Sequence, residues 1–165
     1  MPGPPTLPIE PSPRTRVYAD TSVYGGVFDD RFAWHSAEFF AQVRTGRLRL
    51  VTSALVRLEL EPAPQSVRDF FAELGDLEDA PVSETALDLQ QQYLRASVVG
   101  EGSATDALHV AVATTAHCSI LVSWNYKHIV HRDKAPRYNA VNILAGAPAI
   151  GIFSPAEVLE YGQDL

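Results

Sequence analysis

The chain has 165 residues, which suits one domain of about 150 residues with a single substantial core. It contains 13 Lys or Arg and 20 Asp or Glu, and this net charge of −7 argues against nucleic-acid binding by bulk electrostatics, although a carboxylate-lined metal site would itself add negative charge. No apolar run approaches the roughly 18–20 residues of a membrane span, and the start Met-Pro-Gly-Pro-Pro has no signal-peptide pattern, so we expect a cytoplasmic protein without membrane association.

Strands and helices alternate along the chain after an N-terminal tail. Residues 1–14 contain six prolines and predict an extended or disordered tail, followed by one domain over residues 15–165. Strands are predicted at 16–19, 48–52, 120–123 and 149–153, with a short extended piece at 77–82. Helices are predicted at 33–44, 54–60, 67–74, 84–97, 103–113 and 138–144, and from Pro155 onward. This alternation predicts an α/β domain with a mostly parallel central sheet that helices cover on both faces.

Several residues are expected to serve packing. Trp34 and Phe40 are among the apolar residues that recur at helical spacing in helix 33–44, and Leu87 and Leu94 lie along one side of helix 84–97. The single cysteine, Cys118, excludes an internal disulfide and is predicted to be a small buried hydrophobe rather than a catalytic partner of the neighbouring histidine.

The helix at 103–113 carries one carboxylate in an otherwise almost wholly apolar sequence. Ser103 or Thr105 can cap this helix, and Asp106 would then lie in its first turn, where the helix dipole favours a negative charge. Buried carboxylates are rare without a partner, however. Asp106 is therefore a candidate for metal ligation or catalysis as well as for simple stabilisation of the helix start.

Four polar side chains follow strands, where the functional crevice of an open parallel sheet lies. Asp20 comes directly after the first strand, Glu59 lies on the helix after the second, Asp106 begins the central helix, and Asn125 follows the third clear strand. Three acids and an amide suit a hard cation such as Mg²⁺, which prefers oxygen ligands, better than Zn²⁺. Each residue also has a structural alternative: Asp20 can cap the next helix, Glu59 can be a surface residue, and Asn125 can be a turn residue.

Four segments in this order make the chain resemble the PIN-domain ribonucleases, of the kind found as VapC-like toxins. The segments are VYADTS (17–22), TSALVRLE (52–59), TDALHVA (105–111) and LVSWN (121–125). The resemblance runs from residue 16 to about 153. It implies a PIN-like fold and cleavage of RNA by water that Mg²⁺ or Mn²⁺ activates.

The resemblance also implies roles for individual residues. Asp20, Glu59 and Asp106 take the positions of the family's metal-binding acids, and Asn125 takes a fourth catalytic position, where many relatives carry Asp. Thr21 or Ser22 matches a hydroxyl that often hydrogen-bonds within such sites. The implied partners are RNA and a small antitoxin protein, and we expect a homodimer.

The most basic part of the chain is segment 127–137, which would border the crevice. Lys127, Arg132 and Lys134 are candidates for contact with the RNA backbone, although an ordinary solvated face would look the same. His128 and His131 could suggest a metal pair but lack a nearby third ligand in the sequence. His109, three residues after Asp106, is more typical of a core histidine than of a ligand.

Two other functions compete with the ribonuclease. One is a non-catalytic PIN-like module that binds RNA or a protein, which the missing fourth acid and the acidic composition favour. The other is a receiver-like phosphoacceptor domain with Asp20 in a strand-end pocket, although the early pair of acids typical of receivers is absent from the sequence.

Overall fold

The fold is built on one parallel sheet, described by a computed structural model of residues 15–161; the predicted tail 1–14 and residues 162–165 lie outside the described part. All pairings are parallel, and the strand order is β3-β2-β1-β4-β5. The strands are β1 (Thr15–Ala19), β2 (Leu48–Ser53), β3 (Glu78–Ala80), β4 (Ile120–Val122) and β5 (Gly151–Phe153). The predicted parallel α/β fold is confirmed, and the extended piece at 77–82 contains a strand of the same sheet.

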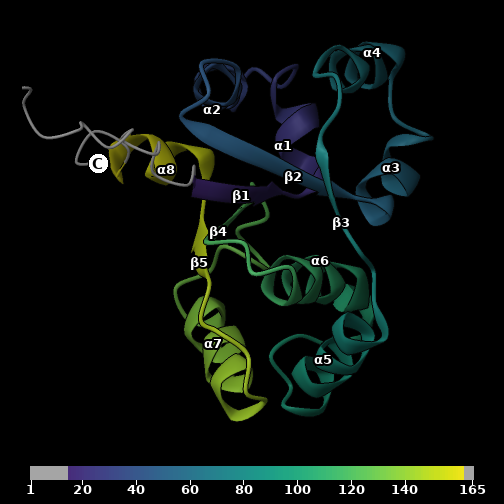
Figure 1. Cartoon of the computed structure of the whole chain (residues 1–165), viewed down its shortest axis with the longest axis vertical. Helices are drawn as coiled ribbons and strands as arrows, with labels where there is room; N and C mark the ends of the chain where they lie inside the picture. The colour runs from purple at the N-terminus through teal and green to yellow at the C-terminus, as the bar shows by residue number, and fades with distance from the viewer. Residues whose placement is uncertain (1–14, 162–165) are drawn as a thin grey trace, which may run out of the picture.

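Helices cover both faces of the sheet (Figure 1), as expected for buried parallel strands. One layer holds α1 (Thr21–Gly26), α2 (Ala33–Arg44), α3 (Ala54–Leu60) and α4 (Gln65–Glu73). The other holds α5 (Glu84–Arg95), a short 3₁₀ turn (Glu101–Ser103), α6 (Ala104–Thr115) and α7 (Lys134–Leu144). The last helix, α8 (Pro155–Tyr161), packs against α2. Within residues 15–161, every helix is too short or too polar to cross a membrane.

The chain reverses its direction across the sheet at β1. From β1 it proceeds to β2 and β3 on one side, and it then crosses to β4 and β5 on the other side. Tyr18 of β1 pairs in register with Val51 of β2 and with Leu121 of β4, and it is fully buried. In such sheets the ligand-binding crevice lies beyond the carboxyl ends of the strands at this reversal. The segments that follow β1, β2 and β4 are therefore the ones that form the site.

The structure corrects two predicted helix faces. Trp34 shares the spacing of the apolar residues in α2 but is 68% exposed, because Phe39 and Phe40 face the core. In α5 the buried side includes Leu89 and Tyr93 rather than Leu87, which is 43% exposed. A hydrogen bond from the Tyr93 hydroxyl to Asn142 of α7 (2.5 Å) ties this side of α5 to a helix of the same layer.

Two helix starts also differ from their predictions. Helix α7 begins at Lys134 rather than at residue 138. Pro136 is tolerated in its first turn, because a backbone N–H at that position would have no acceptor within the helix. Ser103 occupies the N-cap position of α6, but its side chain makes no capping hydrogen bond. Ser53 and Ser83, which precede α3 and α5, do cap their helices: their side chains accept hydrogen bonds from the backbone N–H groups of Val56 and Ala86.

Neighbouring glycines at the end of α1 should respond oppositely to alanine. A Cβ atom on Gly26 would lie 2.6 Å from Ser36 Oγ and 2.7 Å from Trp124 Nε1, whereas one on Gly25 would meet nothing within 4 Å. We expect Gly26→Ala to destabilise the protein by about 1–3 kcal/mol through overpacking. Gly25→Ala should stabilise it by about 0.4–1 kcal/mol, because alanine restricts the unfolded chain. Urea unfolding of both variants checks this, and equal effects would contradict the packing around Gly26.

Candidate functional site

Asp20 lies at the carboxyl end of β1 and is only 4% exposed. One carboxylate oxygen accepts hydrogen bonds from the backbone N–H (3.1 Å) and the hydroxyl (2.5 Å) of Ser22. The other accepts a hydrogen bond from the Ser123 hydroxyl (2.6 Å), which reaches it from the end of β4. The Asp20 side chain thus caps α1, as the structural alternative predicted, and also connects the ends of two neighbouring strands.

Glu59 lies at the end of a chain of polar side chains that crosses the core. Its carboxylate accepts a hydrogen bond from Thr21 (3.1 Å) and is bound to Nε2 of His109. The other ring nitrogen of His109 contacts the Tyr18 hydroxyl (2.8 Å), which also contacts Ser53 (2.8 Å). Nε2 of His109 donates to Glu59, and the Tyr18 hydroxyl, which can donate or accept, satisfies Nδ1 in either protonation state of the ring.

The two carboxyl groups have opposite net pKa shifts, although burial acts on both in the same direction. Burial raises the pKa of Asp20 above its ordinary value; the charge of His109 and the serine hydrogen bonds oppose this shift, and the charge of Glu59 adds to it. Burial also raises the pKa of Glu59, but the hydrogen bond and charge of His109, with the Thr21 hydrogen bond, outweigh it and hold this pKa below its ordinary value. The site therefore holds Glu59 as an anion and makes an ionised Asp20 costly.

The other two predicted residues, Asp106 and Asn125, contact groups other than these two carboxylates. Asp106 is half-buried in the first turn of α6, one turn before His109. Burial raises the pKa of Tyr138 on α7, and the charge of Asp106 adds to this shift. The Asn125 backbone N–H donates to Ser123 Oγ (2.9 Å), and its side-chain oxygen accepts a hydrogen bond from the backbone N–H of His128 (2.8 Å). The Asn125 side chain thus stabilises the turn that follows β4, and Ser123 is hydrogen-bonded to both Asn125 and Asp20.

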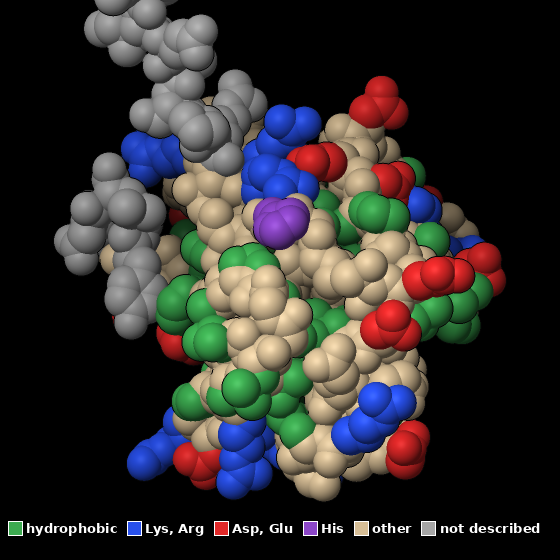
Figure 2. Space-filling model, turned by 60° about the horizontal axis from the view of Figure 1, so that its bottom comes forward, with side chains coloured by type: hydrophobic (Ala, Val, Ile, Leu, Met, Phe, Trp, Pro, Cys, Tyr) green, Lys and Arg blue, Asp and Glu red, His purple; other side chains and the backbone are tan. Residues whose placement is uncertain are grey.

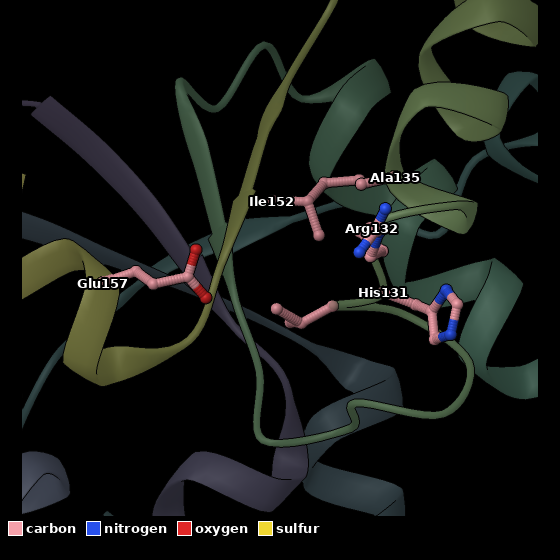
Figure 3. A pocket seen from close by; sticks show the side chains of 6 residues that line it. His131, Arg132, Ala135, Ile152 and Glu157 are labelled. Atoms are coloured by element: carbon pink, nitrogen blue, oxygen red, sulfur yellow. The ribbon is translucent and has the colours of Figure 1, made fainter.

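The predicted RNA-binding residues lie in different surroundings. Lys127 is exposed, whereas the Lys134 ammonium donates to the carbonyl oxygen of Val98 (3.0 Å). Arg132 is exposed and lines an open pocket of about 210 Å³ between the segment after β4, β5 and α8. Figure 3 shows Arg132 on one side of this pocket and Glu157 on the other. The lining residues are Val130, His131, Arg132, Ala135, Ile152 and Glu157, so the pocket is separate from Asp20 and Glu59.

Asp20 and Glu59 have the donor chemistry of a magnesium or manganese site. Mg²⁺ is commonly held by one or two carboxylates together with waters and substrate phosphate. Each oxygen of a carboxylate also has two lone pairs, so the hydrogen bonds to Asp20 do not exhaust its capacity. Among residues 15–161 no three His, Cys, Asp or Glu side chains are grouped closely enough to hold a metal ion. Asp20 and Glu59 therefore fit a cation that is held by two carboxylates, with waters and phosphate as its other ligands.

The sequence did not reveal two members of the site. Ser123 donates a hydrogen bond to Asp20. In the sequence, only its position directly after a buried strand could have indicated this role. His109 is a core histidine, as predicted, and it also holds Glu59. Its spacing of one turn from Asp106 was the available signal. Cys118 is buried as predicted, and burial raises the pKa of its thiol to about 11, which disfavours a nucleophilic role.

Comparisons with known proteins support the fold. No protein-family model and no curated protein sequence matches the chain. Among solved structures it resembles a chain of VapBC2 from Rickettsia felis, with a TM-score of 0.53 and 13% sequence identity. That crystal structure contains VapBC2 bound to a DNA fragment from its promoter. The likeness covers 84% of this chain and 98% of that one. The predicted PIN-like fold class is confirmed at this level.

Proposed function

We propose that this protein is a metal-dependent ribonuclease and the toxin of a toxin–antitoxin pair. The observation that carries the proposal is the pair of carboxylates Asp20 and Glu59, whose charges interact beyond the strand ends where the sheet reverses direction, with Glu59 held by Thr21 and His109. Its fold, which it shares with a chain of VapBC2, and the four PIN-like segments of the sequence support the same assignment.

Each residue of the site has a definite part in this proposal. Asp20 and Glu59 would hold Mg²⁺ or Mn²⁺, and Asp106 would extend the site from the start of α6. A cation bound there would neutralise phosphate charge and activate water for attack on the phosphodiester bond. Ser22 and Ser123 orient the carboxylate of Asp20, while Thr21 and His109 orient that of Glu59. Asn125 positions Ser123 through its backbone N–H.

A non-catalytic PIN-like module remains the second candidate, because the Asn125 oxygen is bound to the backbone and no three-ligand cluster is present in residues 15–161. Such a module would bind RNA without cutting it. A receiver-like phosphoacceptor is disfavoured, since serine side chains bind both oxygens of Asp20 and leave it 4% exposed.

The proposed partners include a second copy of the chain and a small antitoxin. Three large hydrophobic side chains are exposed on α5 and α7: Leu87, Ile143 and Leu144. Figure 2 turns this end of the molecule toward the viewer and shows hydrophobic side chains gathered on it. Exposed apolar patches of this kind commonly mark protein interfaces, which supports a homodimer.

The proposal predicts that the purified full-length chain cleaves single-stranded RNA in millimolar Mn²⁺ or Mg²⁺ and not in chelator. Metal should also raise the melting temperature, since a cation that binds only the folded state adds about 2.7 kcal/mol at a hundredfold excess over its Kd. Gel analysis of labelled RNA and thermal melts measure the two effects. Equal cleavage in chelator would contradict the metal role, and RNA binding without cleavage would favour the non-catalytic module.

The toxin role has a separate test. A small protein encoded directly beside this chain should bind it and suppress RNA cleavage. If the chain cuts RNA and no neighbouring reading frame encodes such an inhibitor, the nuclease assignment stands and the toxin assignment does not.

A further inference from the structure

A continuous strip of aromatic side chains includes Trp124, whose backbone is hydrogen-bonded to Ser22 of the candidate site. We define the aromatic strip by four residues: Trp34, His35, Trp124 and Tyr126. The Trp34 ring meets the His35 ring edge-on (centroids 4.9 Å apart), His35 lies 6.3 Å from Trp124, and Trp124 lies 6.2 Å from Tyr126. The strip thus joins the start of α2 to the segment after β4.

The centre of the strip is rigid and its two ends are open to solvent. Trp124 is 8% exposed, stacks on Phe32 with 4.2 Å between ring centroids, and donates its indole N–H to Ser36 (2.9 Å). Trp34 and Tyr126 are 68% and 48% exposed. The exposed rings of Trp34 and Tyr126 therefore flank the fixed indole of Trp124. A flat ligand could stack on the two exposed rings without any rearrangement of Trp124.

Hydrogen bonds connect the strip directly to the candidate active site. The Trp124 backbone N–H donates to Ser22 Oγ (2.9 Å), and the same hydroxyl donates to Asp20 (2.5 Å). The Trp124 backbone and the Asp20 carboxylate therefore share Ser22 as a hydrogen-bond partner, which places the strip next to the carboxylate that the proposed nuclease requires.

We propose that the aromatic strip binds unpaired nucleobases of single-stranded RNA by stacking, with Trp34 and Tyr126 as the two base-stacking residues. This inference rests on the proposed ribonuclease function and names how its substrate is held. Base stacking on aromatic side chains accepts any base sequence and needs no positive charge. It therefore suits a protein of net charge −7, which has little bulk electrostatic attraction for RNA.

The charges around the strip fit this occupant better than a protein partner. Arg31 lies over the Phe32 ring (4.9 Å), with part of its charge offset by Asp29, and Lys127 is exposed beside Tyr126. Cations between aromatic rings can contact phosphates while bases stack. The most exposed aliphatic side chains, Leu58, Ile143 and Leu144, lie on α3 and α7 instead.

Intrinsic fluorescence offers a direct readout, because both tryptophans of the chain belong to the strip. In chelator, where no cleavage is expected, oligouridine should quench the fluorescence of the full-length protein, and an RNA duplex of equal length should quench it much less. Trp34→Ala and Tyr126→Ala should each weaken oligouridine binding by about 5- to 100-fold, measured by anisotropy of labelled RNA. Neither variant should change the slope of affinity against salt, because a stacking contact releases no counterion.

Matched variants make the test decisive. Trp34→Phe should retain most of the affinity, and Val82→Ala, which shortens an exposed apolar side chain outside the strip, should leave it unchanged. Unaltered binding by Trp34→Ala and Tyr126→Ala, with wild-type melting temperatures, would overturn the proposal. So would a loss of self-association in these variants without a loss of RNA affinity, since that would assign the strip to a protein contact.

The two proposals fail in different ways. If the strip variants bind oligouridine weakly and the wild type does not cleave RNA with Mn²⁺, the proposal for the aromatic strip is supported and the ribonuclease proposal is wrong. If the wild type cleaves RNA and the strip variants bind and cut it equally well, the ribonuclease proposal is supported and the proposal for the aromatic strip is wrong.

Discussion

Replacing Asp20 by asparagine is expected to reduce RNA cleavage by at least about 100-fold, since even groups that only orient a metal ligand contribute 10- to 100-fold. The same change should stabilise the metal-free protein at neutral pH. Asn keeps an oxygen that can accept the Ser22 backbone N–H, so the cap of α1 is retained. What it removes is a buried negative charge.

The pH dependence follows from the raised pKa of Asp20, which burial causes. A carboxyl group whose pKa is higher in the folded than in the unfolded chain destabilises the fold once it is ionised. This penalty is complete above the raised pKa and disappears below the unfolded value of about 4. The stability gain of Asp20→Asn should therefore be largest near pH 7 and should vanish on acidification.

Urea unfolding in chelator between pH 4 and pH 8, paired with cleavage assays, measures both effects. Asp106→Asn is the comparison variant, because it removes a half-buried carboxylate of the proposed site in place of the buried one. A pH-independent loss of stability in Asp20→Asn would mean that helix capping outweighs the cost of the buried charge. Wild-type cleavage by this variant would remove Asp20 from the active site.

Truncation of His109 to alanine is expected to destabilise the protein by about 3–5 kcal/mol, the upper range for a large-to-small change in a core. The side chain is 2% exposed, and its loss would leave a cavity between Tyr18 and Glu59. It would also leave the Tyr18 hydroxyl with Ser53 alone, and a buried polar group that loses a partner is costly.

A double-mutant cycle separates the polar chain from simple packing. His109→Ala and Glu59→Ala should be coupled by about 0.5–3 kcal/mol if the two side chains act as a unit. His128→Ala is the control, since a half-exposed histidine should contribute within about 0.5 kcal/mol. Additive effects would show that His109 stabilises the core without holding Glu59.

Local sequence determined the framework of this protein. Short-range signals placed the strands and most helices, because periodicity, capping serines and prolines act within a few residues. They also placed Asp20 directly after one strand and Asn125 a few residues after another. The caps at Ser53 and Asp20 illustrate this, since each side chain binds an N–H two or three residues away. Once the strands are parallel, their carboxyl ends must share one edge of the sheet, so the position of the candidate site followed from the sequence as well.

Tertiary structure decided which side chains meet at that edge. The bonds from His109 to Glu59, from His109 to Tyr18 and from Ser123 to Asp20 join residues 50, 91 and 103 positions apart. The strand order and the rotation of α6 create these contacts, and neither is visible in local periodicity. The exposure of Trp34 has the same origin, because the packing of Phe39 and Phe40 sets the rotation of α2 and turns an apolar residue toward solvent.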